Sequence, residues 1–354
     1  MIKNIFWNSE ENRLRMLWRL IGQLLILVPV FLILQIALGA ASFALSSAGG
    51  GLDPGALSDP ASVQSLINQN PILNMIAMIS TGLALTISIW IAGRLLDRRK
   101  FADFGLAIDR AWWRDLGFGL GLGALLMGLI FLVEWAAGWI TITGTLVARQ
   151  ADVSFLTALL PPLILFLAVG FYEELFSRGY QLTNLAEGLS GSTLGPRGAI
   201  LAATLISSAV FGALHAGNPN ASFLSSFNIA VAGIFLAAGF LLTGQLAIPI
   251  GLHITWNFFQ GNVFGFPVSG TRFHSATFIA VEQGGPDLWT GAAFGPEAGL
   301  LGLGAMILGT LLTILWVRFH QGESSLQLSI SQPPSPVQST KDAVEADMPP
   351  EGSA

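Results

Sequence analysis

The chain carries a series of long apolar segments, and this feature restricts its fold more than any other. A window of about 19 residues identifies segments that are long and apolar enough to cross a bilayer as helices. Such segments lie near residues 18–43, 72–96, 116–139, 156–181, 198–216, 225–243, 246–265 and 296–317. The sequence therefore predicts an all-α protein, a polytopic transmembrane helical bundle of about eight spans.

The composition agrees with a membrane protein and excludes several functions. Hydrophobic residues make up 53% of the 354 residues and charged residues only 10%, which is far more apolar than a soluble domain. The 16 Lys and Arg residues form no stripe that could neutralise phosphates, so we expect no nucleic-acid partner. The chain has no cysteine, which excludes disulfides, thiolate metal sites and a cysteine nucleophile.

The basic residues predict how the spans are oriented. Fourteen of the 16 Lys and Arg residues precede the first span or follow the second, fourth and eighth. Only Arg149 and Arg272 fall on the opposite side. Because basic residues collect on the cytoplasmic side, we expect a multi-pass protein of the cell membrane with both termini in the cytoplasm.

The chain divides into five parts on this basis. Residues 1–17 are the cytoplasmic N-terminus, 18–155 the N-terminal transmembrane helices, and 156–265 a helical core. Residues 266–320 form an external loop and the last transmembrane helix. The tail 321–354 is poor in aromatic residues and rich in Pro, Ser and acids, so we expect a disordered cytoplasmic segment.

Small residues in the third span indicate close helix packing. Gly117 and Gly121 are four residues apart, and so are Gly119 and Gly123. This spacing superficially resembles a dinucleotide fingerprint, but that motif requires a preceding strand. In an apolar helix such glycines let a neighbouring helix approach closely.

A few polar side chains fall within the predicted spans. A charge near the bilayer centre costs at least about 2.5–3.5 kcal/mol, so each such residue is a functional hypothesis. In chain order they are Glu134, Glu173, Glu174, Arg178, His215, His253 and Asn257. We ascribe Glu134 to the outer interface, because it lies near the end of its span beside a tryptophan.

Helical spacing separates the roles of the two adjacent glutamates. Glu174 and Arg178 are four residues apart with the acid first, which is the favourable order for an ion pair on one helix face. Glu173 points about 100° away and is left free of that arginine. We therefore expect Glu173, rather than Glu174, to accept a proton.

Three motifs on successive apolar segments together resemble a known family. They are E-E-x-x-x-R at Glu173, Glu174 and Arg178, F-x-x-x-H at Phe211 and His215, and H-x-x-x-N at His253 and Asn257. In this order they are similar to the CPBP family of intramembrane proteases. That family includes the CAAX prenyl endopeptidases of the Rce1 type and relatives associated with abortive infection and bacteriocin immunity. The resemblance covers about residues 156–265.

The resemblance implies that water hydrolyses a peptide bond of a membrane-associated protein or peptide substrate within the bilayer. The implied catalytic residues are Glu173, Glu174, His215, His253 and Asn257, with structural support from Arg178 and Phe211. Within this set we assign the base to Glu173 helped by His215. We assign the oxyanion donors to His253 and Asn257. Prenylated CAAX proteins are substrates of the best-known relatives, but no residue here indicates a prenyl-binding groove.

Two accounts of the cofactor stay open. Glu173, His215 and His253 could hold a zinc ion and leave a fourth position for water, as in a metalloprotease. Alternatively the site needs no cofactor, and glutamate and histidine hold the water directly. We favour the second account, because the chain offers no third histidine or cysteine within these spans.

Two other classes of function use the same residues. In a proton-coupled transporter, Glu173, His215 and His253 would form a proton relay, although we find no pair of matching broken helices. In a noncatalytic membrane scaffold or immunity factor, the histidines and Asn257 would serve as contacts between helices. The convergence of these groups on three helices favours the hydrolase.

Overall fold

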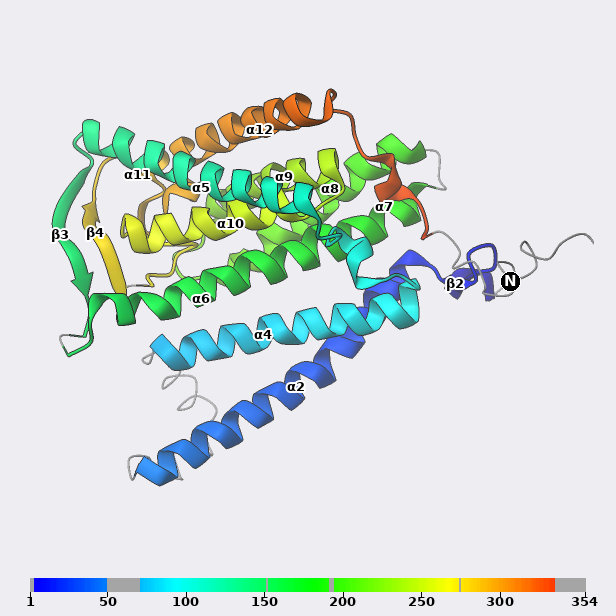
Figure 1. The fold of residues 1–354 in the computed structure, drawn as a ribbon, viewed down its shortest axis with the longest axis horizontal. Helices are drawn as coiled ribbons and strands as arrows, with labels where there is room; N and C mark the ends of the chain where they lie inside the picture. The colour runs from blue at the N-terminus through cyan, green and yellow to red at the C-terminus, as the bar shows by residue number, and fades with distance from the viewer. Residues whose placement is uncertain (1–2, 50–70, 151, 191–193, 274, 335–354) are drawn as a thin grey trace, which may run out of the picture.

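The structure is a computed structural model that describes residues 3–49, 71–150, 152–190, 194–273 and 275–334. Its long helices lie side by side in one bundle (Figure 1). They are α2 (Met16–Gly49), α4 (Pro71–Ala92), α5 (Arg110–Ala136), α6 (Phe155–Glu174), α8 (Gly195–Leu214), α9 (Phe223–Thr243) and α12 (Leu300–Gln321). Seven helical segments of the described chain are long and apolar enough to cross a membrane. The predicted polytopic helical bundle is thus confirmed.

The remaining predicted span, residues 246–265, is present as a shorter helix inside the bundle. It consists of α10 (Ala247–Phe258) and the π-helical turn η6 (Phe259–Val263). With 12 and 5 residues it extends about 25 Å at 1.5 Å per residue. It is enclosed by α5, α6 and α9. Residues 247–254 are all buried, so this segment contacts protein rather than lipid.

The short segment also carries the chain from one end of the bundle to the other. Before α10, the Leu246 amide donates to the Gly105 carbonyl at 2.8 Å. After it, the Asn262 side chain donates to the Ala276 carbonyl at 2.7 Å, at the opposite end. Counting this segment, the described chain traverses the bundle eight times, whereas length and composition alone select seven helices.

A buried ion pair and a hydrogen bond hold the two ends of the described chain at the same end of the bundle. The N-terminal elements are α1 (Lys3–Phe6), β1 (Trp7–Asn8) and β2 (Arg13–Leu14). Arg13 contacts Glu187 at 2.7 Å, and Arg99 donates to the Gln332 carbonyl at 2.7 Å. An even number of traverses requires this arrangement. The assignment of this end to the cytoplasm stays a prediction.

The predicted disorder of the tail is wrong for residues 321–334. A 3₁₀ turn, η9 (Leu328–Ser331), lies against the bundle. The Gln327 amide donates to the Leu241 carbonyl at 2.9 Å, and Ile330 is only 5% exposed within the main apolar core. Composition missed this segment because a single buried isoleucine and a few backbone bonds suffice to hold it. Residues 335–354 lie outside the described residues.

The opposite end carries a small sheet that the all-α prediction did not include. Strand β3 (Ile140–Ala148) pairs with β4 (Ala276–Gln283) in antiparallel register, with Ile140 opposite Gln283 and Ala148 opposite Ala276. The β3 sequence ITITGTLVA is rich in β-branched residues, which favour strands. The pair ties the end of α5 to the loop after α10, beside the short helix α11 (Asp287–Thr290).

Local sequence signals set several helix ends. Asp109, Ser154 and Ser222 cap the starts of α5, α6 and α9, because each side chain accepts a backbone N–H of the first turn. Gly244 and Gly322 end α9 and α12 in the left-handed conformation. Between α6 and α7 (Thr183–Ser190), the π-helical turn η4 (Leu175–Leu182) continues the helix without a break.

The predicted close packing of the third span is confirmed for one of the two glycine pairs. A Cβ at Gly119 would lie 2.3 Å from the Ile248 carbonyl oxygen, and one at Gly123 would lie 2.3 Å from the Thr255 hydroxyl. Both contacts are made with α10. Gly117 and Gly121 have no such neighbour within 4 Å. The backbones of α5 and α10 therefore touch along the face that carries Gly119 and Gly123.

Candidate functional site

The two adjacent glutamates lie at the point where α6 passes into η4. Glu174 is fully buried. Its Oε1 accepts a hydrogen bond from the Arg178 guanidinium at 2.9 Å, so the ion pair predicted from the spacing is present. The same oxygen lies 2.7 Å from Nδ1 of His253 on α10. Glu174 therefore joins its own helix to the central helix of the bundle.

Arg178 contacts two further helices of the bundle. It is 1% exposed and donates to the Gly233 carbonyl of α9 at 2.9 Å. Its guanidinium lies 4.6 Å from the centre of the Phe211 ring on α8, which is cation–π contact. Arg178 and Phe211 thus make structural contacts around Glu174.

Glu173 faces the other nitrogen of the same histidine. Its Oε2 lies 3.9 Å from Nε2 of His253, which is too long for a direct hydrogen bond. This oxygen is buried and has no hydrogen-bond partner among the described residues, while the side chain as a whole remains 23% exposed. The His253 ring therefore lies between the two carboxylates.

Hydrogen bonding determines which nitrogen of His253 carries the proton. A carboxylate can only accept, so Nδ1 must donate its N–H to Glu174. In the neutral ring, Nε2 is then an acceptor directed at the side of Glu173. The histidine cannot donate from Nε2 unless it gains a second proton.

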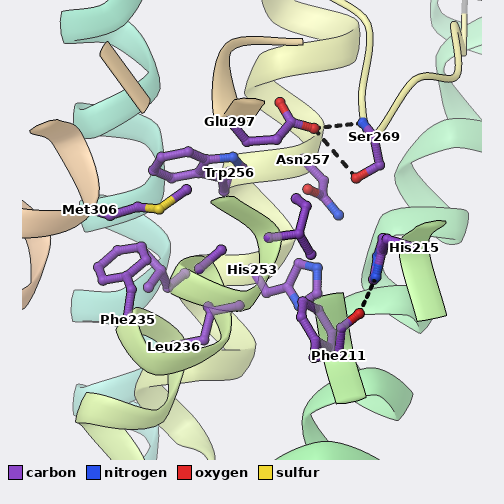
Figure 2. A pocket seen from close by; sticks show the side chains of 13 residues that line it. Phe211, His215, Phe235, Leu236, His253, Trp256, Asn257, Ser269, Glu297 and Met306 are labelled. Carbon is purple, nitrogen blue, oxygen red and sulfur yellow. Dashed lines mark hydrogen bonds between the residues drawn. The ribbon is translucent and has the colours of Figure 1, made fainter. Parts of the chain in front are cut away.

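His215 and Asn257 line a pocket together with His253 (Figure 2). His215 stands at the end of α8, where its Nδ1 lies 2.7 Å from the Phe211 carbonyl oxygen. Asn257 lies one turn after His253 on α10. The pocket has one polar and one apolar part. The apolar part is lined by Ile229, Ala232, Phe235, Leu236, Leu252, Trp256 and Met306.

The structure brings only part of the predicted set into direct contact. Glu173, Glu174 and His253 form one group, and His215 and Asn257 share the pocket with His253. The predicted assistance of Glu173 by His215 has no counterpart among the contacts of the described residues, where His253 is the histidine beside Glu173. Helical spacing could not reveal this choice, because it depends on how separate helices are rotated against each other.

The possible metal set of Glu173, His215 and His253 does not fit a zinc site. No group of three histidine, cysteine or acidic side chains in the described ranges is arranged to hold a metal ion. Two ligands about 2.1 Å from a tetrahedral zinc ion would be about 3.4 Å apart, whereas the Glu173 and His253 atoms are 3.9 Å apart. The geometry therefore gives the zinc account no support.

Two further polar residues of the pocket were missed by the sequence reasoning. Glu297 lies in the short 3₁₀ turn η8 (Pro296–Ala298), and Ser269 lies in the loop after η6. Both line the pocket. The signal for Glu297 was available, because this acid falls inside the segment 296–317 predicted as the last span. No comparable signal marks Ser269, which lies in a loop.

The fold and this site define a class of protein: a multi-pass helical membrane protein with adjacent carboxylates and a histidine in its interior. Residues 155–259 match the family model of the type II CAAX prenyl endopeptidases, Rce1-like. Over this segment the chain is similar to the Rce1-like family, which in general terms comprises CAAX-type intramembrane proteases. No curated protein and no solved structure matches the chain significantly. All residues of the three motifs lie within the matched segment, whereas Ser269 and Glu297 lie beyond it.

Proposed function

We propose that the chain is an intramembrane endopeptidase that hydrolyses a peptide bond of a membrane-associated protein or peptide. One observation carries this proposal: the His253 ring lies between two carboxylates, with Nδ1 at 2.7 Å from Glu174 and Nε2 at 3.9 Å from Glu173. Buried carboxylates and imidazoles are expensive in a membrane interior and mark functional sites. A CAAX-type substrate is the specific expectation that the family contributes.

The gap between Glu173 and His253 has the size that a nucleophilic water needs. A water about 2.8 Å from both the Glu173 oxygen and the His253 nitrogen spans 3.9 Å with an angle of about 90° at its oxygen. Both groups accept hydrogen bonds, so both water protons are engaged. A lone pair of the water oxygen is then free to attack a carbonyl carbon, and Glu173 takes the proton as general base. Glu173 then returns this proton to the peptide nitrogen as the C–N bond breaks, so that a carboxylic acid and an amine are released.

This arrangement changes the roles assigned from the sequence. His253 cannot serve as an oxyanion donor in its neutral form, because its one N–H is held by Glu174. Asn257 keeps the predicted role in this proposal, since its side chain lines the pocket and has no hydrogen bond to any described residue. His215 donates Nδ1–H to the Phe211 carbonyl, so its Nε2 is an acceptor that suits the N–H of the scissile peptide.

The decisive experiment measures cleavage by purified protein reconstituted in liposomes. A farnesylated CAAX peptide is the first probe, and mass spectrometry of new N-termini in expressing cells reports other substrates. We expect the wild type to cleave and Glu173→Gln to lose turnover. Glu134→Gln is the matched control, because Glu134 is a glutamate of α5 that accepts from Gln283 at 2.8 Å and makes no hydrogen bond or ion pair with His253 in the described chain.

The same comparison tests the other two classes of function. If wild-type and Glu173→Gln cells have identical N-termini and the peptide stays intact, the endopeptidase proposal is wrong. Proton flux into the liposomes that depends on Glu173 would then identify a transporter. If the wild-type protein shows neither peptide cleavage nor proton flux, the noncatalytic scaffold is the remaining class.

A further inference from the structure

A glutamate other than Glu173 and Glu174 lines the pocket and has no part in the proposed reaction. Glu297 is 3% exposed. Its Oε1 accepts the Ser269 backbone N–H at 2.5 Å and lies 3.4 Å from the Ser269 hydroxyl. Its Oε2 accepts a hydrogen bond from the Gln260 amide. Figure 2 shows Glu297 and Ser269 together at one end of the pocket, with Asn257 between them and His253.

Glu297 holds a tight turn that forms this end of the pocket, and we call residues Val268–Thr271 the end turn. Val268 and Thr271 exchange backbone hydrogen bonds at 2.8 and 2.9 Å. Ser269 and Gly270 both have positive φ, 47° and 81°, which is the pattern of a type I′ turn. A serine in that conformation is unusual, so its position is imposed by its contacts.

The end turn also accepts a hydrogen bond from the loop that follows His215. The Asn218 side chain, three residues after His215, donates to the Ser269 carbonyl at 3.0 Å. The Gly270 amide donates to the Phe294 carbonyl at 2.7 Å. Gln260 also donates to the Pro267 carbonyl at 2.5 Å. Ser269 is thus fixed between the loop after α8 and the loop before α12.

At this position a carboxylate can accept more hydrogen bonds than an amide, but its charge stabilises the fold less. Two N–H groups, from Ser269 and Gln260, point at the two oxygens, and a glutamine could accept only one of them with its single oxygen. Burial raises the pKa of Glu297 to about 7, against the hydrogen bonds that lower it. The charged side chain therefore weakens the fold near neutral pH, so a stability role does not account for it.

We propose that Glu297 and Ser269 form a subsite for the backbone of the peptide substrate, in which the Ser269 hydroxyl accepts a substrate N–H and Glu297 is the positioning residue. This inference rests on the proposed function of the pocket. The Ser269 hydroxyl contacts substrate beside the scissile bond. Glu297 acts through Ser269, because it holds both the serine amide and its hydroxyl proton.

The test is a double-variant cycle on the reconstituted protein, with the farnesylated CAAX peptide as probe. Ser269→Ala keeps the backbone bond to Glu297 and removes only the hydroxyl. We expect KM to rise about two- to tenfold, which is the effect of one hydrogen bond, while kcat changes less than about twofold. Glu297→Gln should raise KM to a similar extent. The combined variant should be no worse than either single one, since both remove the same contact.

Matched controls come from similar side chains elsewhere in the chain. Glu134→Gln alters another glutamate–glutamine pair, which is partly buried, and Ser325→Ala removes an exposed hydroxyl bonded to Glu323 at 3.2 Å. Both should keep the wild-type KM. Additive effects of Ser269→Ala and Glu297→Gln, or a fall in kcat at constant KM, would overturn the subsite.

Binding separates failure of the subsite from failure of the proposed function. The dissociation constant of the same peptide is measured with Glu173→Gln protein, because binding can be measured without turnover. If the wild type does not cleave but Ser269→Ala still weakens binding, the subsite stands and the endopeptidase proposal falls. If the wild type cleaves and Ser269→Ala changes neither KM nor binding, the subsite is wrong. A wild type that neither cleaves nor binds the peptide overturns both.

Discussion

Replacing Arg178 by methionine tests how the buried charges of the site hold the bundle together. Methionine keeps an apolar stem of similar length but removes the guanidinium. The variant loses the contact with Glu174 at 2.9 Å, the bond to the Gly233 carbonyl at 2.9 Å and the position 4.6 Å above the Phe211 ring. Glu174, which is fully buried, then keeps His253 as its one hydrogen-bond partner among the described residues.

The expected loss follows from the charge that remains. Removing one partner of a buried ion pair destabilises a protein by about 3–5 kcal/mol, because the other charge stays uncompensated. The bond to Gly233 is charge-assisted and would contribute about 1.5–3 kcal/mol by itself. These effects share the same guanidinium and do not add. We therefore expect the free energy of unfolding to fall by about 3–5 kcal/mol.

A second substitution distinguishes lost charge balance from lost packing. The double variant Glu174→Gln/Arg178→Met removes both charges, and the glutamine oxygen can still accept from His253. Neutral replacements of a buried pair are often close to neutral in stability, so we expect the double variant to recover most of the loss.

Unfolding is measured by titrating detergent-solubilised protein with SDS and following the fluorescence of its 10 tryptophans. Arg110→Met serves as the matched control, because Arg110 is exposed in the first turn of α5. The reasoning is refuted if Arg178→Met unfolds within about 1 kcal/mol of the wild type. It is also refuted if the double variant is less stable than Arg178→Met alone.

Four shorter predictions concern other parts of the molecule. Glu173→Gln should lower single-turnover cleavage about 10²–10⁴-fold and leave SDS unfolding unchanged, because its carboxylate has no hydrogen bond among the described residues. Burial raises the pKa of Glu297 from 4.5 to about 7, so the folded protein binds this proton more tightly than the unfolded chain. Protonated Glu297 therefore adds about 3 kcal/mol to the free energy of unfolding. This stabilisation is present below pH 4.5 and is lost as pH rises through about 7. Thermal unfolding at pH 5 and pH 8 should show this loss for the wild type and not for Glu297→Gln. Ile330→Ala should lower the unfolding free energy by about 2–5 kcal/mol, because this side chain is only 5% exposed. If the variant unfolds at the same SDS concentration as the wild type, Ile330 does not pack against the bundle. A reporter fused at Gly322 should be cytoplasmic and one inserted near Gly285 external, and the reverse result for either contradicts the orientation.

The sequence predicted best what depends on neighbours along one helix. The Glu174–Arg178 pair follows from a spacing of four residues, and it is present although the π-helical turn η4 begins between the two residues. The apolar segments likewise follow from local composition. The short α10 segment was also found, because it is apolar even where protein rather than lipid surrounds it.

The sequence could not predict contacts set by packing between distant segments. Which histidine faces Glu173 depends on the rotation of α8 and α10 around α6. The β3–β4 pair joins residues more than 100 positions apart, and neither strand has a partner within its own loop. The docking of Ile330 depends on a hollow formed by other helices, so composition alone indicated disorder.

The geometry of the site depends on a glycine that no catalytic motif contains. Gly170 lies one turn before Glu174 on α6, and a Cβ there would lie 3.0 Å from the Ile254 backbone nitrogen of α10 and 2.6 Å from the Ile254 side chain. The two backbones can therefore approach closely only where this residue has no side chain. His253 precedes Ile254, so the same approach brings its ring within 2.7 Å of Glu174. Gly119 and Gly123 of α5 likewise allow the backbone of α10 to approach closely. The carboxylate–histidine contact is thus held by glycines on two neighbouring helices, and the apolar packing of α10 positions its polar chemistry.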